Sequence, residues 1–194
     1  MQKSKTRDLE ALSEKARRLK LHGLGRELAR RQLKAHPNDF GLLLELAGLE
    51  ETFCCYRRAQ AAIDKAEKAC PPGAMRWVWA QRGHLSKAMG DFKTAGKHYL
   101  AAHRLAPEEA AYLIYAGSAA FAAGRTRRAI GLTTRATRCT KGCIDEAWFN
   151  LGGYWMALRR YREARTCYLK TLEIDPDYRM ARTRLEDVTQ ILAL

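Results

Sequence analysis

The sequence lacks any long apolar segment. No stretch approaches the roughly 18 uncharged apolar residues that a membrane-spanning helix needs. The N-terminal residues, MQKSKTRDLEALSEKARR, are charged throughout and contain no apolar core of a secretory signal peptide. We therefore expect a cytoplasmic protein without a membrane span, in a reducing compartment that keeps its six cysteines as free thiols.

Signatures of catalysis and metal binding are also missing. The sequence has no phosphate-binding loop, no G-x-S-x-G nucleophile motif and no H-E-x-x-H metalloprotease motif. Cys139 and Cys143 form a C-x-x-x-C pair and Cys54 adjoins Cys55, but the five histidines are scattered and complete no four-ligand zinc set. We expect no metal, no cofactor, no catalytic residue and no enzymatic activity.

Proline and acidic residues are scarce. Only five prolines interrupt the 194 residues, and Ala, Leu, Arg and Lys are abundant, which favours helices. Lys and Arg number 35 against 21 Asp and Glu, so the formal net charge is +14. Such a balance favours acidic partners, whether protein, nucleic acid or an anionic surface, but it does not indicate a fold.

What the sequence does contain is an internal repeat, which is clearest at residues 145–178. A large residue, a Leu-Gly pair and an aromatic residue fall at helical spacing, followed by a small residue, a second aromatic residue and a closing proline. The positions are Trp148, Leu151, Gly152, Trp155, Ala164, Tyr168, Thr171 and Pro176. This pattern resembles the tetratricopeptide repeat, a helix–turn–helix unit of about 34 residues.

Earlier segments show the same pattern at nearly the same period. They span residues 40–75, 76–109 and 110–144, and residues 6–39 match more loosely. Arg82 replaces the usual leucine of one segment, and the segment containing Lys141 is one residue longer, with no closing proline. We interpret residues 40–178 as four repeats and residues 1–39 as a degenerate first repeat or a capping helical pair.

The resemblance implies an all-α fold, a right-handed superhelical solenoid of stacked antiparallel helix pairs. Small residues such as Gly117 and Gly152 would let the two helices of a pair approach closely. Gly90 and Gly124 would end helices in the left-handed conformation that glycine adopts at little cost. Residues 179–194 are expected to form a C-terminal capping helix, with an apolar face of Ala181, Leu185, Val188 and Leu192.

The resemblance also implies a binding groove walled by the first helix of each repeat. Carried over by register, its ligand-contacting positions hold Leu44, Glu45, Trp77, Gln81, His84, Lys87, Ile114, Tyr115, Ser118, Phe121, Phe149, Asn150 and Met156. The expected groove is acidic toward its N-terminal end and aromatic or apolar in its C-terminal half. The alternative for the apolar side chains is packing against the adjacent repeat, and for His84 we expect a polar contact rather than catalysis.

These features predict a non-catalytic scaffold, such as an adaptor, assembly factor or chaperone-like protein, that binds a peptide or protein segment in the groove. Exposed apolar patches tend to mark binding sites, and Trp and Tyr are frequent hot spots of binding energy. Pairing of two copies through terminal helices or through the groove stays open.

Basic residues gather at the inter-helix turns and on the second helices, which the repeat geometry is expected to place on the edge and convex side. The runs considered as a basic surface are Arg125, Arg127, Arg128, Arg159, Arg160 and Arg162. They leave a second function open, that of an RNA- or ribosome-associated repeat protein. No nucleic-acid-binding motif accompanies them, and an ordinary solvated face is the simpler interpretation.

Overall fold

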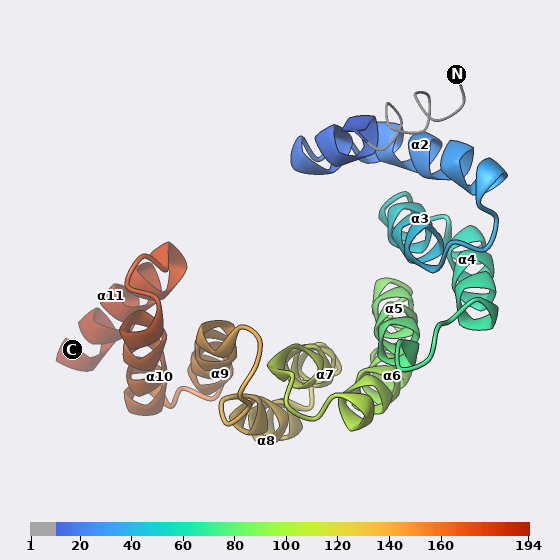
Figure 1. Cartoon of the computed structure of the whole chain (residues 1–194). Coiled ribbons are helices and arrows are strands. Elements are labelled where there is room, and N and C mark those ends of the chain that lie inside the picture. The colour runs from blue at the N-terminus through green and yellow to red at the C-terminus, as the bar shows by residue number, and fades with distance from the viewer. Residues whose placement is uncertain (1–10) are drawn as a thin grey trace. The chain divides into compact units, whose positions relative to one another are not determined.

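A computed structural model describes residues 11–194. Within this range the chain is all-α, and its only β-type pairing is an isolated bridge between Glu109 and Lys141. The chain divides into two compact units, residues 1–91 and residues 92–194. In each unit, consecutive helices are joined by short turns and run in opposite directions (Figure 1). The expected all-α architecture of stacked helix pairs is confirmed, while the part of the N-terminal pair expected at residues 1–10 lies outside the described residues.

The first unit begins with helical residues 11–18 and continues through four helices. These are α2 (His22–Ala35), α3 (Phe40–Thr52), α4 (Tyr56–Lys68) and α5 (Met75–Ala88). Asp39 caps α3, because its carboxylate accepts a hydrogen bond from the Leu42 backbone N at 2.8 Å. The core between α3, α4 and α5 contains Ala47, Ala59, Ile63, Val78 and Leu85.

The second unit contains six helices. They are α6 (Phe92–Leu105), α7 (Ala110–Ala122), α8 (Thr126–Ala136), α9 (Ile144–Ala157), α10 (Tyr161–Ile174) and α11 (Arg179–Ala193). Helix α7 packs against α6, α8 and α9, and it is apolar on nearly every side. The main core of this unit therefore forms around α7 and includes Tyr99, Leu113, Leu132 and Tyr154.

Helix α11 covers the last helix pair by packing against α10. Ala181 and Val188 are fully buried there, and Leu185 packs against the same cluster. The expectation that Leu192 belongs to this face is wrong, because its side chain is 41% exposed. The packed face of the capping helix thus ends before its last turn.

Two glycines set the distance between paired helices. A Cβ at Gly152 of α9 would lie 2.6 Å from Cε1 of Tyr168 on α10, closer than van der Waals contact permits. A Cβ at Gly117 of α7 would overlap the Thr133 hydroxyl of α8 even more severely. Both glycines therefore hold the close-approach positions that the repeat pattern predicts.

The turn after the first helix of each pair uses the left-handed backbone conformation. Gly90 and Gly124 have φ values of 79° and 72°, as the sequence predicts, and Cys54 and Arg159 adopt φ values of 56° and 57° at the corresponding turns. Lys20, just before α2, does the same at φ 54°. The division of the chain into repeats, with a degenerate first repeat or a capping helical pair in residues 1–39, stays a prediction.

The segment between α8 and α9 is where the sequence predicts an extra residue. Gly142 adopts a φ of 89°, and Lys141 pairs with the start of α7. The Lys141 backbone N donates to Glu108 O at 3.0 Å, and the Ala110 backbone N donates to Lys141 O at 3.0 Å. These hydrogen bonds anchor the longer connection to α7.

Candidate functional site

In the first unit, α3 and α5 lie side by side and carry the expected groove residues of this part of the chain. Gln81 of α5 extends over Gly48 of α3, since a Cβ at Gly48 would lie only 3.5 Å from the Gln81 amide nitrogen. A Cβ at this position would therefore be in ordinary van der Waals contact with the amide. The two first helices thus present a joint polar surface at this point.

His84 and Lys87 extend that polar surface along α5. Burial lowers the pKa of His84 below its usual 6.5, and the positive charge of Lys87 lowers it further. Burial likewise raises the pKa of Glu51 on α3, while Lys87 opposes that rise. Lys87 is therefore electrostatically close to both residues.

The acidic end expected in this unit is partly neutralised. Glu45 forms an ion pair with Arg17 at 3.2 Å, and Arg17 also forms an ion pair with Glu14 at 2.7 Å. Leu44 beside it is half-buried. This region is consequently less acidic than the sequence alone indicates.

Trp77 is the most exposed aromatic side chain among the expected groove residues. It is 48% exposed, and Arg76 lies over its ring at 5.0 Å from the ring centroid. An exposed indole that is already stacked with a guanidinium offers both an apolar face and a hydrogen-bond donor to a partner.

In the second unit, α7 and α9 are neighbours and carry the expected aromatic half of the groove. Phe121 is 39% exposed and lies 4.7 Å from the Tyr154 ring of α9. Tyr115 is half-buried against Tyr99, at a ring distance of 5.3 Å. Ser118 lies between them on α7 and is partly exposed.

Phe149 and Met156 of α9 are more deeply packed than a free groove residue would be. Phe149 lies 5.8 Å from Tyr168 and 5.0 Å from Tyr178, and both Phe149 and Met156 contact the core cluster of the last helix pair. Both residues pack against neighbouring elements and are at the same time partly exposed. Asn150 remains partly exposed next to them.

Ile114 is a correction to the expected groove. It is only 2% exposed and belongs to the core of the second unit. The cause is the environment of α7, which has packed helices on several sides and so leaves little of its surface free. Ile114 stabilises the fold and is not available to a partner.

Two features of this surface, Tyr178 and Gly153, were missed from the sequence. Tyr178, at the start of α11, stacks on Phe149. Burial raises the pKa of both Tyr115 and Tyr178, and the negative charge of Glu146 on α9 raises it further, so Glu146 lies near both tyrosines. Gly153 of α9 has open space where a Cβ would project. Because Gly153 shares a helix face with Phe149, Asn150 and Met156, this open space belongs to the candidate groove.

Known proteins resemble this chain in one repeat and in the fold. The model of the tetratricopeptide repeat matches residues 145–178. A thermophilic tetratricopeptide repeat protein of Thermus thermophilus, TTC0263, superposes with a TM-score of 0.75 at 18% identity, over 95% of this chain and 98% of that one. Residues 145–178 therefore match a tetratricopeptide repeat, and the chain has the fold of tetratricopeptide repeat proteins.

Other repeat proteins share its fold. One from Parabacteroides merdae has a TM-score of 0.75 at 13% identity, over 93% of this chain and 70% of that one. YrrB, described as having an unusual peptide-binding site, has a TM-score of 0.59 at 15% identity, over 88% and 87% of the two chains. No curated protein matches by sequence. At these identities the neighbours establish the fold alone, and repeat arrays of this fold generally serve as protein-interaction scaffolds.

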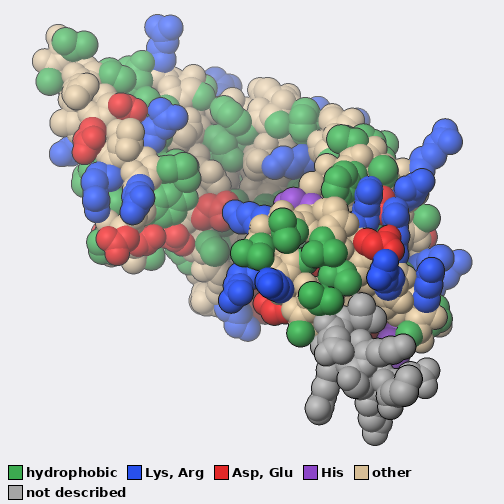
Figure 2. Space-filling view, turned by 90° about the horizontal axis from the view of Figure 1, so that it is seen from above, with side chains coloured by type: hydrophobic (Ala, Val, Ile, Leu, Met, Phe, Trp, Pro, Cys, Tyr) green, Lys and Arg blue, Asp and Glu red, His purple; other side chains and the backbone are tan. Residues whose placement is uncertain are grey.

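The expected basic surface is exposed but not uniform. Arg125, Arg127 and Arg128 are exposed at the start of α8. Arg160, in contrast, pairs with Glu163 and lies 5.4 Å from the Trp155 ring centroid. Figure 2 shows Lys and Arg side chains in separate groups with apolar side chains between them. Such a distribution is typical of a solvated repeat surface.

The six cysteines of the chain are all free thiols. Cys167 is buried, and that burial raises its pKa to about 12, so its thiol stays protonated. Among residues 11–194, no three His, Cys, Asp or Glu side chains are grouped so that they could hold a metal ion. Over the same residues no helix is long and apolar enough to cross a membrane.

Proposed function

We propose that this chain is a non-catalytic scaffold that binds a peptide or protein segment along the first helices of its repeats. One observation carries the proposal. On α7 and α9, partly exposed Tyr115, Phe121 and Asn150 lie on the helix faces that also include the open space at Gly153. Leaving aromatic surface in water is unfavourable, so a partner that covers it gains free energy.

The chemistry of these side chains suits an extended peptide. Phe121 and Tyr115 offer apolar faces to an anchor side chain, and the space at Gly153 leaves room for the backbone of the ligand to approach α9. The Asn150 amide has both donors and an acceptor, which matches the alternating groups of a peptide backbone. Glu146, near the tyrosines, favours a basic or N–H-bearing group on the ligand.

The first unit carries its own set of groups. Trp77 offers an apolar anchor, Gln81 and His84 offer hydrogen bonds, and Lys87 offers a positive charge that is already shared with Glu51. The neighbour YrrB has a peptide-binding site, which makes peptide binding a reasonable expectation for this fold. Adaptor, assembly-factor and chaperone-like roles are all compatible with this mode of binding.

RNA association has weaker support. Arg160 is already paired with Glu163, and the aromatic side chains of α7 and α9 pack against protein side chains rather than forming an open stacking surface beside the arginines. The alternative therefore rests on net charge and on the exposed arginines at the start of α8.

The class of partner is tested by co-purification of the full chain with and without nuclease treatment, followed by mass spectrometry. We expect partner proteins that survive nuclease. Recovery that disappears after nuclease, together with a steep salt dependence of binding to random-sequence RNA, would instead support the RNA alternative.

A further inference from the structure

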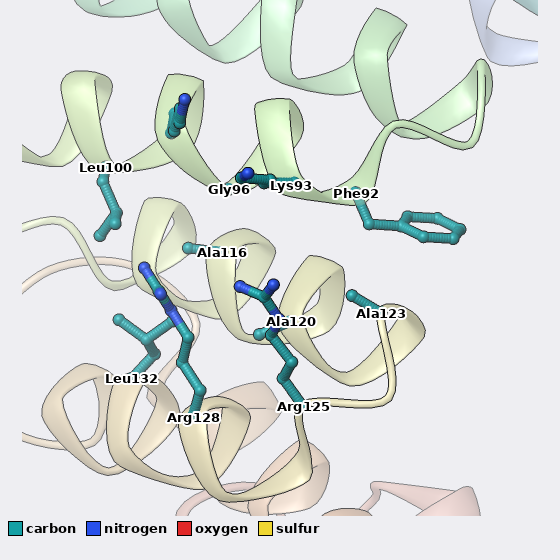
Figure 3. A pocket seen from close by; sticks show the side chains of 11 residues that line it. Phe92, Lys93, Gly96, Leu100, Ala116, Ala120, Ala123, Arg125, Arg128 and Leu132 are labelled. Carbon is teal, nitrogen blue, oxygen red and sulfur yellow. The ribbon is translucent and has the colours of Figure 1, made fainter.

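A pocket lies on another face of the second unit, between α6 and α8, with α7 as its floor (Figure 3). Its volume is about 100 Å³. The floor residues Ala116, Ala120 and Ala123 face away from Ser118 on the same helix. The pocket is thus separate from the groove proposed above, and the inference drawn from it does not depend on that groove.

The inside of the pocket is apolar. Leu100 of α6 and Leu132 of α8 close one end, and Ala116 and Ala120 form the base. No acidic or amide side chain lines it. Because an apolar cavity of about 150 Å³ accommodates benzene, this smaller one suits a single aliphatic side chain.

The rim of the pocket is cationic. Lys93 and Lys97 stand on the α6 side, and Arg125 and Arg128 extend from α8 toward α6 in Figure 3. All four side chains are exposed, and within residues 11–194 none of them forms an ion pair with a carboxylate. Four uncompensated cations around an apolar cavity attract an anionic ligand with an apolar group.

The first unit has a hollow at the corresponding place, between α2 and α4 above α3, and it differs in one respect. There Glu50 of α3 accepts a hydrogen bond from Arg30 at 2.5 Å, so the chain supplies its own anion. Counted from the first residue of each helix, Ala120 of α7 occupies the position of Glu50, and Arg128 occupies that of Arg58. By the same count, Leu100 of α6 stands at the position of Arg30, so the second unit keeps the cation of α8 but lacks both the internal carboxylate and the arginine that pairs with it.

We infer that this pocket binds an acidic peptide segment of a partner protein. One aliphatic side chain of the segment enters the cavity, and its flanking carboxylates pair with Lys93, Lys97, Arg125 and Arg128. A nucleic acid fits less well, because the floor consists of alanines and Phe92 is the single aromatic residue of the lining, which leaves no row of rings on which successive bases could stack.

The test uses the full chain and a fluorescein-labelled peptide of glutamates with one central leucine. Gly96→Leu fills the mouth of the pocket, since a Cβ at Gly96 meets open space, and it leaves all four cations in place. Gly131→Leu on α8 is the matched control, because Gly131 also has open space but does not line the pocket. Circular dichroism melts establish that both variants fold.

By fluorescence anisotropy, we expect wild type and Gly131→Leu to bind equally, and Gly96→Leu and the double variant Arg125→Gln/Arg128→Gln to bind at least tenfold more weakly. Replacing the peptide's leucine by glycine, or its glutamates by glutamines, should cause a similar loss. Unchanged binding by folded Gly96→Leu would overturn the inference. So would RNA that binds more tightly than the peptide and loses its affinity in Gly96→Leu. Loss in Gly153→Leu but not in Gly96→Leu would place the peptide in the groove, which would contradict this inference while supporting the proposed function.

Discussion

The Glu50 carboxylate of α3 is buried beneath the Arg30 guanidinium of α2, with an Nη2–Oε1 distance of 2.5 Å. Glu50 is only 1% exposed, and its second oxygen lies 3.8 Å from Arg26 without a hydrogen bond. Arg26 in turn lies over the Phe53 ring at 4.0 Å. These contacts hold α2 against α3. The repeat pattern in the sequence is weakest just before this boundary between helix pairs.

The first prediction concerns this pair. Glu50→Gln keeps the shape of the side chain but removes its charge, so the arginines lose a buried partner. We expect a loss of about 1–3 kcal/mol in the free energy of unfolding of the first unit. Urea unfolding combined with amide hydrogen exchange of α2 and α3 measures it. The control Glu163→Gln, which removes an exposed ion pair with Arg160, should change little, and an unaltered Glu50→Gln would show that the buried pair contributes nothing.

A second prediction follows from the close approach of paired helices. Gly152→Ala and Gly117→Ala place a methyl group against Tyr168 and Thr133, so each should destabilise the second unit by about 1–3 kcal/mol. Gly131→Ala, where a Cβ meets open space, should stabilise it by about 0.5–1 kcal/mol because alanine favours helix. Thermal melts should show a lower melting temperature for Gly152→Ala and Gly117→Ala and a higher one for Gly131→Ala. The same change in melting temperature in all three variants would show that the paired helices can move apart without loss of stability.

A third prediction concerns the turn at Arg159, whose φ of 57° is unfavourable for a residue with a side chain. Arg159→Gly should be more stable than Arg159→Ala by about 1 kcal/mol, since glycine adopts this conformation readily. The comparison removes the arginine charge from both variants, so only backbone strain separates them. If the two variants unfold at the same urea concentration, the turn is not strained.

The pH dependence of stability gives a fourth prediction. Burial and Lys87 hold the pKa of His84 below its usual 6.5 in the folded chain. As the pH falls through 6.5, the unfolded chain takes up a proton at this position that the folded chain does not, so stability decreases. His84→Gln should make the fall in melting temperature between neutral and acidic pH shallower. Some pH dependence of the melting temperature should remain in His84→Gln, because burial and Arg135 also lower the pKa of His103.

The helix pairs and their contacts could be predicted from the sequence because the signal is local and repeated. Gly152 and Tyr168 form a small–large pair within one repeat, and Gly90 and Gly124 mark turns that need left-handed backbone. Cys54 and Arg159 adopt the same turn without glycine, so composition alone did not reveal them. Leu192 was misassigned because helical spacing extends an apolar face beyond the helix that covers it.

The candidate site was less predictable, because exposure depends on neighbours that a register does not describe. Ile114 occupies a ligand-contacting position but is buried by the helices around α7. Gly153 carries no side chain, so its contribution, an open space, could be found only in the structure. The basic pocket needed three helices to be placed together, and only Arg125 and Arg128 among its cations had been singled out as part of a basic surface.

Peptide binding along the first helices is best tested at Gly153. Peptides are selected from a random display library on the full wild-type chain, and their affinities are then measured for Gly153→Leu and Gly131→Leu. Both variants add the same side chain to an open helical glycine, so both should remain folded. We expect at least a tenfold loss of affinity in Gly153→Leu and none in Gly131→Leu. Equal affinity of both variants for every selected peptide would contradict peptide binding along the first helices.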